Sequence, residues 1–464
     1  MRHPWSARAL LLAVPVGLAV LLSSPFAEAG TMTILQNFPG VDFLNSDCGC
    51  LPPDSMGAVS PTQVAEIVNL EFAVYSKSGT LAQRMSQNTF VTNAGLSGFS
   101  NGDARVAYDA SSGRWFAAGN LNNNSIYLVR SDTSDATGTW KGVTIPIAGF
   151  PDMPTLSVAG NAVYIATTDF GNTTTAVDAF TIPKADIVAA TPSLANMTSF
   201  TGLDYSKYGS TVQGFEGGFL GKDAYSPQSK LFLTPVNGAG APSATLGAPV
   251  AINVLDGAPL PLATQPGAPN SVATNDTRLA SGVVRVGNQI FATNTISVAG
   301  RDAVHWMIVD ALTNTLTFEG TIGDPNFDFY FPSIAANANG DFVIGFNRSG
   351  GSAPDGFIGS FAEVCSTSTG LSCSIPMLLA SGAETVPDSF RWGDYSATVV
   401  DPTDPLKFWT FQEIAPVDSG TNIWTTQITE IGITSATVPE PGILLLLGSG
   451  LAGLAGLAWR RTRQ

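Results

Sequence analysis

The chain has 464 residues, of which 44% are apolar and only 12% are charged. The apolar share is that of a globular protein, and it excludes a chain that is disordered throughout. The formal net charge of −15 argues against a nucleic-acid-binding protein, which normally presents a basic face. With only two His residues, the chain also lacks the ligands for a multi-histidine metal site.

Residues 1–29 have the three parts of a secretory signal peptide. A start carrying two Arg residues precedes an apolar core over 9–22, and Ala27 and Ala29 form a small-x-small cleavage site. We therefore predict a mature chain that begins near Gly30. The apolar core is short for a spanning helix, so an uncleaved anchor is the weaker alternative.

Residues 30–437, the body of the chain, show mostly the period-two alternation of strands, interrupted by Gly, Asn, Asp and Pro. Clear examples are Ala162–Thr167, Gln289–Asn294 and Asp341–Phe346. One short helix is expected near Lys184–Ala190. The sequence therefore predicts an all-β body.

A degenerate repeat runs through the body, and each copy starts near an Asp or an aromatic-Pro pair. Asp54, Asp103 and Asp152 are spaced 49 residues apart, and later copies start near Phe331 and Asp394. About seven units of four short strands fit this spacing. We predict a seven-bladed β-propeller of four-stranded antiparallel blades, because radial closure leaves only short sheet edges. Six blades, or a pair of β-sandwiches, are the alternatives.

The four cysteines fit an oxidising compartment, and they allow three pairings. Cys365 and Cys373 flank a Ser/Thr/Gly-rich loop, and we favour a disulfide between them that staples a hairpin. A Cys48–Cys50 bond is tight but feasible, whereas a cross-pairing would tie the start of the body to a late repeat. A metal site is the weaker reading.

Residues 438–464 form a second three-part signal. The motif Val438–Gly442 is followed by the apolar run Ile443–Trp459 and by a basic tail over 460–464. A helix over that run would be roughly 25 Å long, just enough to cross a thin hydrocarbon layer. The basic tail favours the cytoplasmic side. The residues that would mark a cleavage site are Val438, Pro439, Glu440 and Pro441.

This tail resembles the PEP-CTERM sorting signal of Gram-negative bacteria. The resemblance implies transient anchoring in the inner membrane through a transmembrane helix and cleavage by an exosortase, a membrane cysteine protease. It also implies export to the cell surface, the outer membrane or the extracellular matrix. A permanent single-span anchor is the alternative.

Two resemblances concern the body. Ser134–Trp140 is similar to the Asp-box of sialidase-type and BNR propellers, in which a short turn with Asp and Gly links two outer strands above a packed Trp. Separately, the stretches 52–59, Ser333–Asp341, Arg391–Thr398 and Phe408–Glu413 look like a group of secreted bacterial propeller proteins of unassigned activity. Both resemblances imply a propeller fold.

A sialidase-like site would need three Arg residues on a carboxylate, a Tyr–Glu nucleophile pair and an acidic Asp, because only Arg grips a carboxylate with two parallel hydrogen bonds. Alternatively, these charges cap sheet edges or pair with neighbouring Asp residues. The candidates are Arg105, Arg278, Arg301 and Arg391, with Tyr395, Glu413 and Asp103.

The Asp residues at repeat starts (Asp54, Asp103, Asp152 and Asp394) are expected to accept backbone N–H bonds. No cofactor is expected, with a structural Ca²⁺ as the alternative use of these carboxylates. His305 lies in an apolar strand and is expected to be packed rather than catalytic. The residues expected to form blade core rather than sugar platforms are Trp115, Trp140, Trp392, Trp409 and Trp424.

The favoured function is a non-enzymatic propeller, exported by the secretion machinery, processed by exosortase and retained at the surface or in the exopolysaccharide matrix, where it binds glycans or proteins. The alternative is a sialidase-like glycoside hydrolase acting on extracellular glycans. A structural matrix component with no specific ligand is the third reading.

Overall fold

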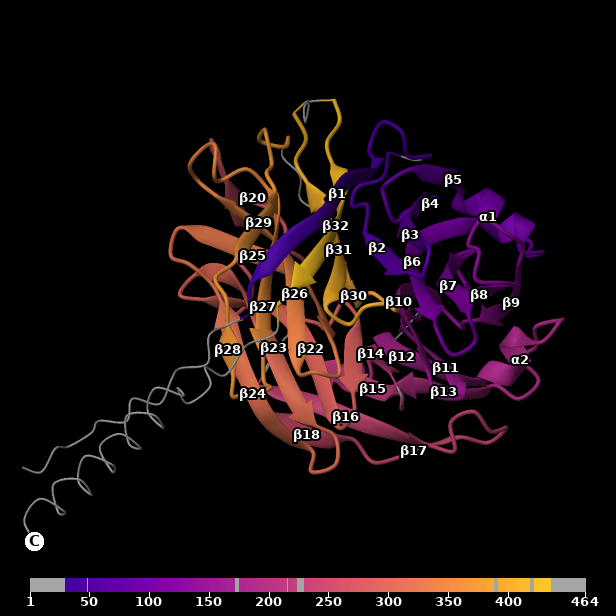
Figure 1. Ribbon diagram of the computed structural model, residues 1–464. Helices are drawn as coiled ribbons and strands as arrows, with labels where there is room; N and C mark the ends of the chain where they lie inside the picture. Colours follow the sequence, from indigo (N-terminus) through magenta and orange to yellow (C-terminus); the bar gives the residue numbers. More distant parts are fainter. Residues whose placement is uncertain are drawn as a thin grey trace, which may run out of the picture. The chain divides into compact units, whose positions relative to one another are not determined.

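The computed structural model describes residues 30–47, 49–171, 175–214, 216–222, 229–387, 391–417 and 421–434 (Figure 1). The predicted signal peptide with Ala27 and Ala29, Cys48 and the sorting signal over 438–464 lie outside these residues. Residues 29–437 cluster as one compact unit. No helix within the described ranges is both long and apolar enough to cross a membrane.

The described body is all-β, as predicted, apart from two short helices. Helix α2 (Lys184–Val188) lies where the sequence predicts one. Helix α1 (Gln87–Asn93) was not expected, and it begins at Ser86, whose hydroxyl accepts a hydrogen bond from the Thr89 amide. This hydroxyl caps an otherwise unpaired helix N–H and explains where the helix starts.

Three sheets are four-stranded and antiparallel, and in each of them chain neighbours pair, except that β1 joins the third sheet from the other end of the body. The first contains β2 (Met56–Val59), β3 (Gln63–Val68), β4 (Glu71–Ser76) and β5 (Leu81–Ser86). The second contains β6 (Ser100–Asp109), β7 (Arg114–Leu121), β8 (Ser125–Ser131) and β9 (Trp140–Pro146). The third contains β30 (Ala397–Val400), β31 (Lys407–Ile414), β32 (Thr425–Ile433) and β1 (Met32–Asp42).

Three more meanders are joined into one thirteen-stranded sheet by parallel pairing of their first strands, β10, β14 and β21. One contains β10 (Phe150–Ala159), β11 (Ala162–Phe170), β12 (Thr175–Pro183) and β13 (Thr198–Leu203). The next contains β14 (Ser210–Gly214), β15 (Gly218–Lys222), β16 (Lys230–Asn237), β17 (Thr245–Leu246) and β18 (Val250–Asn253). The last contains β21 (Val283–Val286), β22 (Gln289–Val298), β23 (Arg301–Asp310) and β24 (Thr315–Ile322).

The remaining strands form a five-stranded sheet and a small hairpin. The sheet contains β25 (Phe327–Ala336), β26 (Asp341–Gly350), β27 (Gly359–Ser366), β28 (Ser372–Cys373) and β29 (Met377–Ala380). The hairpin contains β19 (Ala263–Gln265) and β20 (Ala268–Val272).

The two ends of the body meet in one sheet. Strand β1 pairs antiparallel with β32, the last strand of the body, from Met32 opposite Ile433 to Asp42 opposite Thr425. This pairing joins segments almost 400 residues apart, so it closes the sequence of sheets and protects the edge of the last one.

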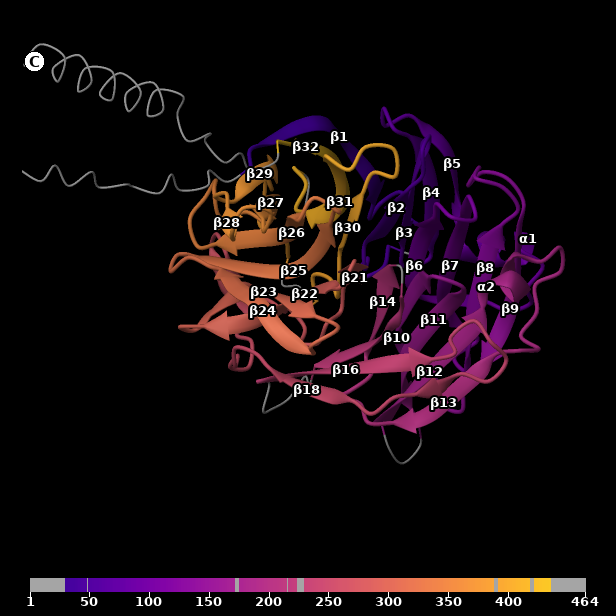
Figure 2. The ribbon, with the colours of Figure 1, turned by 60° about the horizontal axis from the view of Figure 1, so that its bottom comes forward.

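The first strands of successive meanders lie next to one another around a common centre (Figure 2). Contacts run from β2 to β6, β10, β14, β21, β25 and β30, and from β30 back to β2. The body is therefore propeller-like, with its first strands innermost.

The repeat seen in the sequence corresponds to a shared backbone conformation at the start of several meanders. Asp54, Asp103, Met153 and Phe331 all adopt the left-handed conformation, with φ between 47° and 55°. Pairing is irregular beside three of them, in β6, β10 and β25. A bulge of this kind bends the strand and redirects its side chains.

The core lies between the sheets, as the sequence predicts. All five Trp residues expected to be core are buried, and Phe72, Phe90 and Trp140 stack between the first and second meanders. Such aromatic contacts add to the stabilisation that apolar burial provides.

Candidate functional site

The acidic residues at or just before the starts of the innermost strands lie close enough to influence one another. Burial raises the pKa of Asp54 well above its usual range, and the neighbouring carboxylates of Asp394 and Asp103 raise it further. Burial and Asp103 likewise raise the pKa of Asp152 to about 6. We call this group the start cluster. It comprises Asp54, Asp103, Asp152 and Asp394 with Arg105, Arg278, Arg391, Tyr395 and Glu413.

Two Asn residues hold the acidic side of the start cluster. Asn69 donates to the carboxylate of Asp54 at 2.8 Å and accepts from the Asp103 amide at 2.7 Å, which connects two meanders. Asn120 donates to Asp103 at 2.8 Å, and the Met153 amide donates to the same oxygen at 3.2 Å. The expectation that these Asp residues accept backbone N–H bonds is thus met at Asp103.

Each Arg of the start cluster has its own partner in the protein. Arg105 is 3% exposed, donates to the carbonyl of Pro154 at 2.8 Å and lies 3.4 Å from the ring centre of Tyr395. Arg278 pairs with Asp276 at 2.7 Å, and Arg391 pairs with Asp394. A grip on a ligand carboxylate by three Arg residues would require breaking these contacts.

A further Arg candidate lies outside the cluster. Arg301 pairs at 2.8 Å with Asp328, which also accepts from the amides of Thr264 and Asp302. This ion pair connects β23 to β25 and to the β19–β20 hairpin. Its role is structural.

The Tyr and Glu candidates are both buried but do not bond to each other. Glu413 accepts from the Ser55 hydroxyl at 3.4 Å, and the Tyr395 hydroxyl has no hydrogen-bond partner within the described part of the chain. Burial raises the pKa of both groups well above their usual ranges. A Tyr nucleophile needs an adjacent base to take its proton, and this geometry does not supply one.

Three carboxylate oxygens of the start cluster are buried and have no hydrogen-bond partner among the residues that the structure describes: Asp54 Oδ1, Asp394 Oδ1 and Glu413 Oε2. Such oxygens are the ligand type that Ca²⁺ prefers. Within the described ranges, however, the one group of acidic or sulfur atoms close enough to share an ion is Glu363, Cys365 and Cys373. The described carboxylates of the cluster therefore form no ready-made calcium site.

The free space at the start cluster is small. Two cavities there have volumes of about 10 and 20 Å³, and Arg278 lines both. A cavity of this size holds about one water molecule, not a sugar ring. A larger cavity of about 300 Å³ lies along the innermost strands, and its walls are mostly aliphatic, including Val59, Val106, Ile334 and Val399.

His305 is completely buried in β23, as expected for a packed residue. Its Nε2 lies 3.0 Å from the carboxylate of Glu319, which also accepts from the Leu255 amide at 2.8 Å. Burial lowers the pKa of His305 to about 4, so the imidazole is neutral at pH 7. The pair holds a loop against β24.

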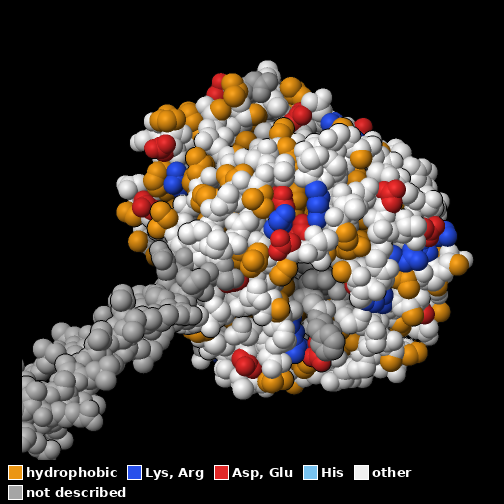
Figure 3. Space-filling view, in the orientation of Figure 1, with side chains coloured by type: hydrophobic (Ala, Val, Ile, Leu, Met, Phe, Trp, Pro, Cys, Tyr) orange, Lys and Arg blue, Asp and Glu red, His pale blue; other side chains and the backbone are white. Residues whose placement is uncertain are grey.

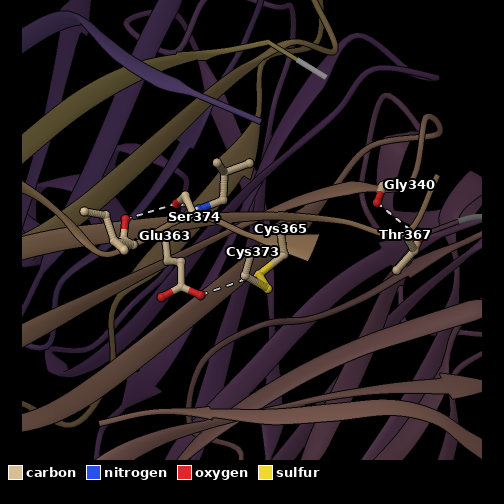
Figure 4. The surroundings of a disulfide bond; sticks show 8 residues. Gly340, Glu363, Cys365, Thr367, Cys373 and Ser374 are labelled. Atoms are coloured by element: carbon tan, nitrogen blue, oxygen red, sulfur yellow. Dashed lines mark hydrogen bonds between the residues drawn. A yellow bond between two sulfur atoms is a disulfide. The ribbon is translucent and has the colours of Figure 1, made fainter. Parts of the chain in front are cut away.

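The predicted Cys365–Cys373 disulfide is present and connects β27 to β28 (Figure 4). This bond excludes the cross-pairings, while the Cys48–Cys50 prediction involves a residue outside the described ranges. The buried carboxyl of Glu363 lies 3.7 Å from the Cys365 sulfur, and burial raises its pKa to about 7. The two sulfurs are bonded to each other, so this group is not a metal site.

The Ser134–Trp140 turn links β8 and β9, the two outer strands of its meander. Asp135 accepts from the amide and hydroxyl of Thr137, and the indole of Trp140 donates to the carbonyl of Ala136 at 2.8 Å. Gln63 of the preceding meander bonds to both Asp135 and Ala136 at 2.8 Å. The turn therefore fastens two meanders together.

Sequence comparison identifies the tail. The family model for the PEP-CTERM protein-sorting motif matches residues 437–463. The chain carries a PEP-CTERM sorting signal. A protein with this signal is exported and processed by an exosortase, which confirms the prediction drawn from the same residues. None of the curated proteins matches the sequence.

Solved structures similar to the chain have low scores. The WD40 domain of Neurospora crassa Pan2 is 6% identical over 89% of this chain and 96% of its own, with a TM-score of 0.42. The endo-arabinase from Bacteroides thetaiotaomicron VPI-5482 is 12% identical over 75% and 97%, with a TM-score of 0.31. A Bacteroides caccae protein of unknown function is 12% identical over 68% and 94%, with a TM-score of 0.36. Scores this low carry no argument about activity.

Proposed function

We propose that the protein is an exported, non-enzymatic β-propeller that is retained at the cell surface or in the exopolysaccharide matrix and binds glycans there. The PEP-CTERM signal supports the route of export. The observation that most favours binding over catalysis is the start cluster, whose Arg residues are occupied by protein partners and whose cavities hold about one water molecule.

We further propose seven blades, each of four principal strands, in a body that spans 30–437. Support comes from the contacts of the innermost strands, which return from β30 to β2 after seven steps. The pairing of β1 with β32 supplies the outer strand of the last blade. Closure through a strand from the opposite end of the chain is a way for a ring of sheets to avoid an exposed edge.

The alternative is a glycoside hydrolase that uses the start cluster. It would need two carboxylic groups on opposite sides of a bound sugar, one of them protonated at neutral pH. Asp152, whose pKa burial raises to about 6, and the buried Glu413 are the groups that favour this reading. Two observations argue against a hydrolase. The cavities at the start cluster are small, and Tyr395 and Glu413 contact different residues.

No cofactor belongs to this proposal. A Ca²⁺ ion among Asp54, Asp394 and Glu413 would have to draw their unpartnered oxygens together and compete with the Arg391 guanidinium. Chelation with EDTA should therefore leave the melting temperature of the purified body unchanged. An increase of several degrees in the melting temperature on adding Ca²⁺ would instead establish a structural calcium site.

Hydrolysis of a panel of fluorogenic glycosides separates binding from catalysis. We expect no turnover by the wild-type protein, together with retention on immobilised exopolysaccharide. Turnover that is lost in Arg391→Ala and in Glu413→Gln, with folding intact, would establish the hydrolase instead. Arg84→Ala, which removes an Arg from β5, the last strand of the first meander, serves as the matched control.

A further inference from the structure

The largest cavity described here lies away from the start cluster, along one side of the β14 meander. It has a volume of about 700 Å³ and is bounded by the β10–β11 turn, β14, β15, β16 and the β23–β24 turn. We call it the inter-sheet cleft. Binding sites for small ligands and cofactors generally have volumes of about 300–1,000 Å³, so the cleft has the size of a binding site.

The cleft exists because one meander departs from the regular pattern. Strand β14 pairs in parallel with β10 at Ala159 and with β21 from Val283 to Arg285. Its antiparallel pairing with β15 is limited to Ser210 and Thr211. The chain must therefore leave the ring after β14, and β16 and β18 lie at the rim (Figure 2).

Gly214 makes this departure possible. Its φ is 148°, and a Cβ there would lie 2.2 Å from the carbonyl oxygen of Arg285. A larger residue would push β14 away from β21 and change the wall of the cleft. The opening is thus encoded in the sequence and is not a packing defect between equivalent sheets.

Three side-chain amides lie along the cleft. Asn161, Asn237 and Asn314 line it, and within the described residues none of their side chains makes a hydrogen bond to the protein. Each amide offers donors and an acceptor, the combination that a sugar hydroxyl matches. The buried side chains of Tyr164 and Leu233 also line the cleft.

The charge of the cleft is balanced. Arg285 and Glu216 both line it and form an ion pair at 2.9 Å, so neither charge is available to an ionic ligand without loss of the other's partner. The chain as a whole carries a net charge of −15, which disfavours an anionic polymer. On the face seen in Figure 3, charged side chains also form only small groups within a largely uncharged surface.

We propose that the inter-sheet cleft binds a short segment of a neutral polysaccharide. Amides and apolar side chains, in a cleft whose Arg and Glu are paired with each other, match a neutral sugar chain better than a uronic acid polymer or a charged peptide. The proposal rests on the glycan-binding function proposed above and assigns it to a site.

The test is affinity electrophoresis of the purified protein in gels that contain dextran, galactomannan, a mixed-linkage β-glucan or polygalacturonate. We expect retardation by at least one neutral polymer and none by polygalacturonate. The double variant Asn161→Ala/Asn237→Ala should bind that polymer about thirtyfold more weakly, since two hydrogen bonds of about 1 kcal/mol each are lost and every 1.4 kcal/mol is tenfold. Asn124→Ala, at another exposed turn, is the matched control and should bind like the wild type.

The possible outcomes distinguish an error in the proposed binding site from an error in the proposed glycan-binding function. Equal retardation of wild type and double variant would overturn the site but leave glycan binding in place. Retardation by polygalacturonate alone would overturn the neutral ligand. No retardation in any gel would remove both proposals. A polymer that protects the backbone of 233–239 from hydrogen exchange supports the site without any variant, and equal exchange with and without a bound polymer contradicts it.

Discussion

The guanidinium of Arg105 lies 3.4 Å from the ring centre of Tyr395, at the centre of the body. Both residues were candidates for a reaction with a glycan, and the structure places them in contact with each other. They belong to β6 and to the segment before β30, and Met56 at the start of β2 also contacts Arg105. This contact between a buried cation and an aromatic side chain stabilises the packing of the innermost strands against one another.

Replacing Arg105 therefore tests whether the start cluster is structural. Arg105→Met keeps the apolar stem but loses the ring contact and the bond to Pro154, and we expect a loss of about 1–3 kcal/mol in unfolding free energy. Lys207→Met is the control, because the side chains of its ion pair with Asp204 are 34% and 47% exposed and an exposed ion pair contributes about 0–1 kcal/mol. Chemical denaturation measures both, and equal losses would contradict a structural role specific to Arg105.

The pH dependence of stability should be governed by buried carboxyls, of which Glu66 is the clearest. Burial raises the pKa of Glu66 to about 7, although it accepts from the Val41 amide at 3.0 Å and from the Tyr75 hydroxyl. The folded state then holds a proton that the unfolded state releases near pH 4.5, so stability is greatest below that pH and declines as the pH rises through 7. The contribution is at most about 3 kcal/mol.

Glu66→Gln keeps an acceptor for Val41 and removes the titration. We expect its melting temperature to fall less between pH 5 and pH 8 than that of the wild type. Some slope should remain, because the pKa values of Asp302 and Glu363 are also raised to about 7 by burial. If the melting temperatures of the two proteins changed by the same amount between pH 5 and pH 8, Glu66 would not be a buried group that titrates in this range.

Gly40, on β1, is packed so closely against neighbouring side chains that there is no room for a Cβ atom. A Cβ there would lie 2.3 Å from Glu66 Oε2 and 2.4 Å from Thr426 Oγ1. We expect Gly40→Ala to cost about 1–3 kcal/mol through overpacking. Gly282→Ala is the matched control, since its Cβ would meet open space. Thermal unfolding compares the two, and an equally stable Gly40→Ala protein would show that β1 is not tightly seated.

Some of the repeat starts could be predicted from the sequence to the residue, and others could not. Asp54 and Asp103 marked repeat starts correctly, because residues that tolerate a left-handed backbone are few and recur with the repeat. In the third copy that conformation falls on Met153, one residue after the expected Asp152. Met153 itself carries no signal for that conformation, so the spacing locates the third repeat start only to within one residue.

Other features depend on contacts between distant strands. Asn69 and Asn120 were missed, although they follow their Asp partners by similar sequence separations of 15 and 17 residues. The inter-sheet cleft could not be foreseen, since it depends on parallel pairing at Gly214. Local sequence patterns indicate the periodicity of strands and the positions of turns. They do not indicate which innermost strands lie next to each other.

The disulfide offers a test in the β27–β28 region. Cys365 and Cys373 close a loop with a sequence separation of 8, and the chain-entropy model gives about 2–3 kcal/mol for a loop this short. The double variant Cys365→Ser/Cys373→Ser should lose that amount, and dithiothreitol should destabilise it less than the wild type. An identical response of both proteins to the reductant would show that this bond contributes nothing.

The central claim is that the body binds glycans without cleaving them, and one measurement tests it most directly. Purified protein is incubated with insoluble and soluble extracellular polysaccharides, and co-sedimentation and the release of reducing ends are recorded from the same samples. We predict co-sedimentation with at least one polymer and no release above the buffer blank. Release of reducing ends that disappears in Glu413→Gln protein would contradict the claim.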